Sequence, residues 1–279
     1  MGSSTWTTTC YTTNLSSRGF ATTDSVTYSN ASQVFTRKTM PDTLNPYKVV
    51  RECCDSEEHP NTIPIMLCLD VTGSMNAASK ACIAKLNDVM VKLYEDFTDI
   101  ELAIAGIGDF AYDEAPFQLS QFESDERIVD NLFNLYIENG GGGNSFESYT
   151  AAWYAGIHHT RLDCWNRGKR GILITIGDEE LNPYLPKNEV SKVFGDTVQA
   201  DVDTNELYKQ VCEKYDVYHI VITNDSCFKG HKEGIERTWG QLLGQHLIYA
   251  KHEDLAEAIH NIVSDAQTGF NSSTNEISW

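Results

Sequence analysis

Acidic and hydroxyl side chains follow the first long apolar run of the sequence at alternating positions. The run covers residues 63–69, and Asp70, Thr72 and Ser74 come directly after it. In an extended chain alternating residues point to the same side, so one carboxylate and two hydroxyls would face one place. Magnesium prefers six oxygen ligands and tends to keep some of its waters. The spacing therefore predicts a divalent-cation site, in which neutral hydroxyls leave the ion free to accept a carboxylate from a partner.

Two other apolar runs are also followed by acids. Asp178 comes after the run 171–176 and predicts a second acidic ligand, bound directly or through water. Asp109, with Asp113 and Glu114 behind it, comes after the run 100–107. Ligands of open α/β sheets bind beyond the carboxyl ends of the strands, so these acids should collect at one edge. We favour a solvated acidic loop for the second group over a rim of the site or a second ion. Glu179 and Glu180 are interpreted as rim charges.

A glycine-rich segment supplies a third group of candidate ligands. Gly140–Gly143 precede Asn144, Ser145 and Glu147, just before a segment of helical pattern. Consecutive glycines let the backbone bend tightly near an ion. Glu147 has two interpretations of equal weight, a metal ligand or part of a helix cap, because Ser or Asn followed by Glu is common at helix starts. Asn144 and Ser145 are preferred at the metal.

Apolar runs alternate with segments of helical spacing over most of the chain. Short continuous apolar runs are typical of strands buried on both faces, and apolar residues three and four apart form one stripe of a helix. We predict an α/β, Rossmann-like fold: a mostly parallel central sheet, helices on both faces, and one short antiparallel edge strand. The strands are expected at 63–69, 100–107, 117–122, 171–176, 217–223 and 247–250, and the helices at 82–97, 128–137, 148–162 and 255–263.

The motif Asp70-Val71-Thr72-Gly73-Ser74 resembles the Asp-x-Ser-x-Ser signature of the metal-ion-dependent adhesion site (MIDAS) in von Willebrand factor A (vWA) domains. Threonine replaces the first serine. The glycine-rich segment resembles the second loop of that family, although many members carry a threonine there, and Asp178 resembles the aspartate of the third loop. The similarity covers roughly residues 60 to 265.

The resemblance implies a vWA fold and a bound Mg²⁺, with Mn²⁺ or Ca²⁺ left open. It also implies a function in protein binding without catalysis, in which an acidic side chain of the partner completes the metal coordination. Intracellular members of the family often act in multiprotein assemblies, including assemblies with an AAA+ ATPase, so a partner of this kind is expected.

Two enzymatic functions were weighed against this one. A Mg²⁺-dependent phosphohydrolase on a Rossmann-like fold would place a nucleophile at Asp70. That pattern requires a second aspartate two positions later, where Thr72 stands, and a nearby base to hold the phosphoryl group, whereas the nearest is Lys80. A dinucleotide-binding domain is disfavoured because no Gly-x-Gly-x-x-Gly follows the first strand.

Composition narrows the partners and the compartment. The chain of 279 residues has 40 acidic and 21 basic side chains, a net charge of −19 that repels nucleic acids and anionic lipid surfaces. The first twenty residues are polar and lack the apolar core of a signal peptide. The eight cysteines form no C-x-x-C motif, and Cys68 and Cys82 are expected to be small buried side chains. We therefore expect a cytoplasmic protein with no nucleic-acid or membrane partner.

The chain divides into three parts by composition. Residues 1–60 form a Ser/Thr-rich extension and a connector, of which the alternation at 25–35 could form an edge strand. Residues 61–266 form the vWA-like domain, and 267–279 a polar tail. Trp153 is expected in the core. His158 and His159 are adjacent on a predicted helix and do not share a face, which disfavours a joint metal site.

Overall fold

The fold is built on a six-stranded sheet whose strands lie in the order β12-β11-β7-β2-β3-β4. The computed structural model describes residues 5–18, 35–72, 76–137, 146–224 and 228–268, except for the side chains of residues 76–84, 86 and 146. The strands of the sheet are β2 (Ile63–Asp70), β3 (Ile100–Ile107), β4 (Phe117–Leu119), β7 (Gly171–Gly177), β11 (Tyr215–Ile222) and β12 (Leu247–Ala250).

Five strands of this sheet are parallel, and β4 pairs with β3 in the antiparallel direction. This confirms the predicted α/β fold with one antiparallel edge strand. The chain lays down β2, β3 and β4 toward one edge, then crosses over and adds β7, β11 and β12 on the other side of β2. The strand order therefore reverses between β2 and β7, which is the place where doubly wound sheets bind ligands.

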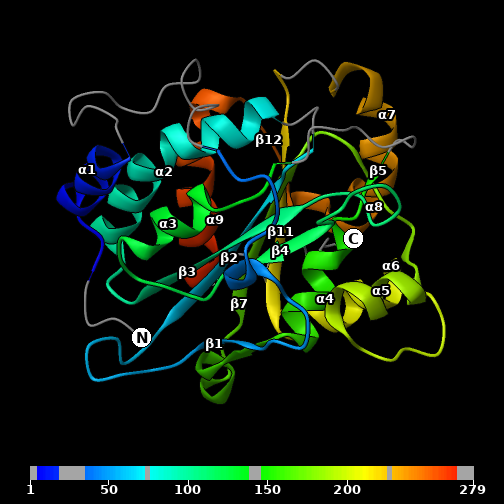
Figure 1. The fold of residues 1–279 in the computed structure, drawn as a ribbon, viewed down its shortest axis with the longest axis horizontal. Helices are drawn as coiled ribbons and strands as arrows, with labels where there is room; N and C mark the ends of the chain where they lie inside the picture. Colours follow the sequence, from blue (N-terminus) through cyan, green and yellow to red (C-terminus); the bar gives the residue numbers. More distant parts are fainter. Residues whose placement is uncertain (1–4, 19–34, 73–75, 138–145, 225–227, 269–279) are drawn as a thin grey trace, which may run out of the picture.

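Helices cover both faces of the sheet and make a three-layered molecule (Figure 1). Along β2, Ile65, Leu67 and Leu69 join one hydrophobic core, and Met66 and Cys68 join the other. Burial on both faces explains why the strand reads as a continuous apolar run. One core is closed by α1 (Thr8–Ser17), α2 (Asn76–Asp96), α3 (Arg127–Phe133) and α9 (Leu255–Thr268). The other is closed by α4 (Thr150–His158), α5 (Lys187–Phe194), α6 (Thr204–Val211), α7 (Phe228–Thr238) and α8 (Gly240–Leu243).

Three two-stranded ladders and several single helical turns complete the structure. The ladders are β1 (Arg51–Cys53) with β6 (Thr160–Leu162), β5 (Phe146–Glu147) with β8 (Glu180–Leu181), and β9 (Tyr184–Leu185) with β10 (Val202–Asp203). The 3₁₀ turns are η2 (Asp42–Leu44), η3 (Asp163–Arg167), η4 (Gly244–His246) and η5 (His252–Asp254).

The amino-terminal extension differs from the extended arm that its Ser/Thr content predicts. Thr8–Ser17 form α1, which begins where the Thr7 hydroxyl accepts a hydrogen bond from the backbone N–H of Cys10 at 3.1 Å. Tyr11 and Leu15, four residues apart, are buried in the core beside α2 and α3. Tertiary burial of this short apolar stripe thus outweighs the weak helix propensity of its serines and threonines. The expected strand at 25–35 lies almost wholly outside the described residues.

Two expected helices are shorter in the structure. The segment 128–137 is helical only up to Phe133, and the segment 148–162 divides into α4 and the strand β6. The helices α5 to α8 were missed. In α5 the apolar residues buried in the core are Val190 and Phe194, one helical turn apart, and one pair is too short a stripe to show a period.

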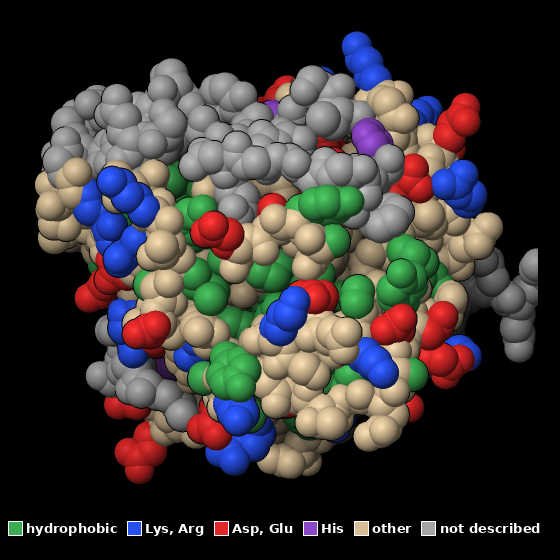
Figure 2. Space-filling model, turned by 45° about the vertical axis from the view of Figure 1, so that its right-hand side comes forward, with side chains coloured by type: hydrophobic (Ala, Val, Ile, Leu, Met, Phe, Trp, Pro, Cys, Tyr) green, Lys and Arg blue, Asp and Glu red, His purple; other side chains and the backbone are tan. Residues whose placement is uncertain are grey.

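None of the helices in the described ranges is both long enough and apolar enough to cross a membrane. Acidic and basic side chains are interspersed over the face shown in Figure 2, with hydrophobic side chains exposed between them.

Candidate metal-binding site

Asp70 and Asp178 lie where the strand order of the sheet reverses. Asp70 is the last residue of β2, and Asp178 follows Gly177, the last residue of β7. These strands are neighbours, with Leu69 opposite Ile176, so the two aspartates lie one and two residues beyond the same rung of the sheet. Neither aspartate is exposed to solvent. The structure therefore brings two of the predicted ligands to the ligand-binding edge of the fold.

Hydrogen bonds hold both carboxylate oxygens of Asp70. Thr72 donates its backbone N–H and its hydroxyl to Oδ1, at 3.0 and 2.6 Å. The Tyr149 hydroxyl donates to Oδ2 at 2.7 Å. Asp70 and Thr72 are thus in contact, as their spacing predicts. Ser74 lies outside the described residues.

Tyr149 is a residue of the site that the sequence analysis missed. Its ring is fully buried and packs edge-on against His219 and Trp239, with centroid distances of 5.2 and 5.3 Å. A β-carbon at Gly177 would collide with the Tyr149 hydroxyl, so glycine is required there for the bond to Asp70. Nothing local marks this tyrosine, because its partner is 79 positions away in the sequence.

Glu147 belongs to the short strand β5 and not to a helix cap. It pairs with Leu181, and α4 begins only at Thr150, with no side-chain hydrogen bond at its N-cap. The interpretation of Glu147 as a capping residue is therefore wrong. Its side chain is 3% exposed, and Oε2 has no hydrogen-bond partner among the described residues. Asn144 and Ser145, the other candidates from this loop, lie outside the described ranges.

The loop after β3 contributes a further buried acid. Asp109 is 4% exposed, and its Oδ1 accepts a hydrogen bond from the N–H of Ala111 at 2.7 Å. Asp113 accepts the N–H of Asp109 at 2.7 Å and lies so close to Gly108 that a β-carbon there would collide with it. The prediction of a solvated acidic loop is correct for Glu114, which is exposed, and wrong for Asp109, which is buried.

The charges that raise the pKa values of Glu147 and Glu179 are negative. Burial, and then the charge of Asp70, raises the pKa of Glu147 well above its ordinary value. Glu179, Asp109 and Asp113 raise it further. Burial followed by Asp70 and Asp109 raises the pKa of Glu179 to about 7. Buried carboxylates that lie close together raise one another's pKa and are costly to ionise, so the chemistry of this edge is compatible with a cation.

The donor atoms fit a hard cation, since the described ones are carboxylate and hydroxyl oxygens. No three His, Cys, Asp or Glu side chains within the described part converge closely enough to hold a metal by themselves. A cation at this edge would therefore need hydroxyl ligands as well, and Thr72 is the one that the structure describes beside Asp70.

Residues considered outside the site have other partners. Trp153 is fully buried in the core, as predicted. His159 lies 2.8 Å from Asp196 through Nε2, whereas His158 packs against the ring of Tyr154 at 4.5 Å. The buried position of Cys68 is confirmed.

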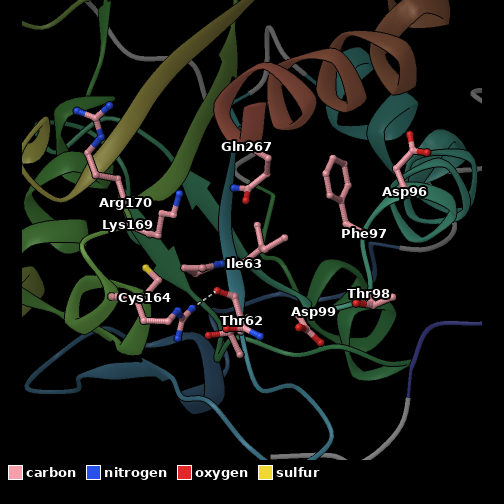
Figure 3. A pocket seen from close by; sticks show the side chains of 13 residues that line it. Thr62, Ile63, Asp96, Phe97, Thr98, Asp99, Cys164, Lys169, Arg170 and Gln267 are labelled. Atoms are coloured by element: carbon pink, nitrogen blue, oxygen red, sulfur yellow. Dashed lines mark hydrogen bonds between the residues drawn. The ribbon is translucent and has the colours of Figure 1, made fainter. Parts of the chain in front are cut away.

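A second group of charged residues lies at the opposite, amino edge of the sheet, around a pocket of about 370 Å³ whose lining includes Thr62 and Arg167 (Figure 3). Asp55 accepts hydrogen bonds from the N–H and the hydroxyl of Thr62, at 3.1 and 2.7 Å, and forms an ion pair with Arg167. Arg167 also donates to the Thr62 carbonyl at 2.8 Å. Lys169 and Arg170 line the same pocket. Burial alone would raise the pKa of Asp55, but these bonds hold it below its ordinary value.

Comparison with known proteins gives similar folds at low identity. No protein-family model and no curated protein matches the sequence. The pilus adhesin SpaC of Lactobacillus rhamnosus GG, in its open conformation, is similar with 11% identity and a TM-score of 0.49, over 75% of this chain and 30% of SpaC. The vWF domain of the type V pili tip protein Mfa5 of Porphyromonas gingivalis is similar with 12% identity and a TM-score of 0.45, over 77% and 98%. This chain thus spans about a third of SpaC.

Proposed function

We propose that this protein is a vWA-type module that binds a protein partner through a divalent cation at the carboxyl edge of its sheet. The supporting observation is the concentration of buried acids at the reversal of the strand order, where Glu147 is acted on by negative charges. The motif from Asp70 to Ser74 and the strand order are consistent with this family.

In this proposal the cation, Mg²⁺ in the first instance, is held by oxygens of the three predicted loops. Asp70, Thr72 and Asp178 are the described candidates, with Glu147 beside them. Ser74, Asn144 and Ser145 complete the predicted set. The bound ion offsets the negative charge of the edge and offers a coordination position to a carboxylate of the partner.

We also propose that the module catalyses nothing. A phosphohydrolase with Asp70 as nucleophile would need a second acid two positions later, where Thr72 stands and donates its hydroxyl to Asp70 Oδ1 at 2.6 Å. That hydrogen bond stabilises the charged carboxylate. A phosphatase assay with and without Mg²⁺ tests this, and turnover that Asp70→Asn abolishes would contradict it.

Calorimetric titration with Mg²⁺ tests the cation site. Asp70→Asn should weaken Mg²⁺ binding by at least about 100-fold, because it removes a charged ligand. The matched control is Glu206→Gln, which removes an equal charge from the exposed surface of α6 and should leave the affinity unchanged. Mg²⁺ at 100 times its Kd should also stabilise the wild type by about 2.7 kcal/mol. Equal Mg²⁺ affinity in wild type and Asp70→Asn would contradict the proposal.

A further inference from the structure

A groove of about 330 Å³ lies next to the candidate metal-binding site. Its walls come from three places: Pro46 and Tyr47 of the connector, Asp113 and Glu114 of the loop after β3, and Glu189 and Lys192 of α5. Apolar side chains contribute to the same lining, so the groove is amphipathic.

The groove and the metal-binding site share Asp113. This carboxylate lines the groove, accepts the N–H of Asp109 at 2.7 Å, and acts electrostatically on Glu147. The groove is therefore within reach of a partner that binds at the cation.

The charge of the groove is predominantly negative. Asp113, Glu114 and Glu189 line it together with a single basic residue, Lys192. Lys192 forms an ion pair with Glu189 at 2.7 Å, so the lining of the groove has two more acidic than basic side chains. An occupant of complementary charge is basic.

The connector wall of the groove is held in a fixed conformation. Tyr47 is 45% exposed, and the next residue, Lys48, has a φ of +56°, in the left-handed region that non-glycine residues rarely adopt. The N–H of Lys48 donates to the Phe194 carbonyl at 2.9 Å. Gly195, with a φ of +77°, allows the close approach, since a β-carbon there would lie 2.7 Å from the Lys48 side chain. Such conformations persist where the surroundings enforce them and often occur at binding sites.

From these observations we infer that the groove binds a lysine or arginine side chain of the partner, on the same segment that presents the acid to the cation. This inference rests on the proposed function. Specificity then comes from a pair of opposite charges on the partner: the acid meets the ion, and the base meets Asp113 and Glu114 while its aliphatic stem packs on Tyr47.

Fluorescein-labelled peptides with one Asp and one Lys, separated by about two to six residues, provide the probe, because this range covers up to about 20 Å of extended chain. Each has two matched controls, with Asn for Asp and norleucine for Lys. Anisotropy in Mg²⁺ should show that the best Asp/Lys peptide binds about fivefold more tightly than its norleucine control. A Glu114→Gln/Glu189→Gln variant should lose this preference, and the surface control Glu206→Gln should keep it.

The results separate the groove from the cation site. Binding that depends on Asp and Mg²⁺, with equal affinity for lysine and norleucine, overturns the groove and leaves the proposed function in place. A lysine preference that Glu114→Gln/Glu189→Gln removes, without dependence on Asp or Mg²⁺, supports the groove and contradicts the cation function. Absence of a lysine preference at every spacing overturns the groove.

Discussion

Acidic side chains lie at both edges of the central sheet, but the groups around them differ. At the amino edge Asp55 receives bonds from Thr62 and Arg167, and its pKa lies below the ordinary value. At the carboxyl edge Glu147 has one oxygen with no hydrogen-bond partner among the described residues, and burial, followed by negative neighbours, raises its pKa.

The difference lies in how the charge of each acid is compensated. A buried carboxylate paired with a guanidinium is satisfied, whereas several buried carboxylates together destabilise one another. The interactions at the amino edge are therefore accounted for by the stability of the fold. Under the function that we propose, a bound cation would offset the cost of the buried acids at the carboxyl edge, so that stability is exchanged for function.

One substitution at each edge gives the largest expected change in the free energy of unfolding, and the two changes have opposite signs. Arg167→Met should lower the free energy of unfolding by about 2–3 kcal/mol, because Asp55 stays half-buried without its counter-charge. Glu147→Gln should raise it by about 1–2 kcal/mol without metal, because the raised pKa of Glu147 makes folding at pH 7.5 cost the uptake of a proton, and the neutral amide avoids that cost. Urea unfolding in EDTA at pH 7.5 measures both.

The matched control for the amino edge is Arg161→Met. Arg161 pairs with Glu52 at 2.6 Å, but its side chain is 65% exposed, so its loss should change stability by no more than about 0.5 kcal/mol. Destabilisation by Glu147→Gln as large as that by Arg167→Met would remove the distinction between the edges.

The parts of this picture that the sequence predicts are those encoded locally. The apolar run of β2 predicts a strand buried on both faces. The alternating spacing after it predicts that Asp70 and Thr72 lie together, and they are in contact. The bond from Tyr149 to Asp70 joins positions 79 residues apart, so no local pattern contains it. The same holds for the burial of Asp109, since the hydrogen bonds of its loop form only when the chain has folded.

The sequence pattern does not predict the short helices for a related reason. In α1 and α5 the buried residues are only one turn apart, and most of the remaining positions are polar. Their helical state depends on the core that they pack against, which the sequence pattern does not show.

A smaller effect is expected from the support beneath the carboxyl edge. His219 is fully buried, stacked on Trp239 at 3.8 Å, and burial lowers its pKa to about 3. The unfolded chain binds a proton near pH 6.5 and the folded chain does not, so this histidine lowers stability as the pH falls from 6.5 toward 3. Between pH 6.5 and 5 the loss is about 2 kcal/mol.

His219→Phe keeps the stacking and removes the titration. Urea unfolding at pH 7.5 and pH 5 in EDTA should show a shallower loss of stability in this variant than in wild type. His231→Gln on α7 is the control and should follow the wild type. An equally steep loss in His219→Phe would mean that the acid sensitivity of the carboxyl edge comes from its carboxyl groups alone.

The smallest expected effect tests whether Tyr149 belongs to the site or only to the core. Tyr149→Phe keeps the ring between His219 and Trp239 but removes the hydrogen bond to Asp70. The free energy of unfolding should fall by about 1 kcal/mol. If the hydroxyl orients Asp70 for a cation, Mg²⁺ affinity measured by calorimetry should fall about tenfold as well, as with other residues that position ligands. A purely structural tyrosine would change stability and leave Mg²⁺ affinity untouched. In that case the two edges would differ only in their charges. The hydrogen bond from Tyr149 would not orient Asp70 for a cation.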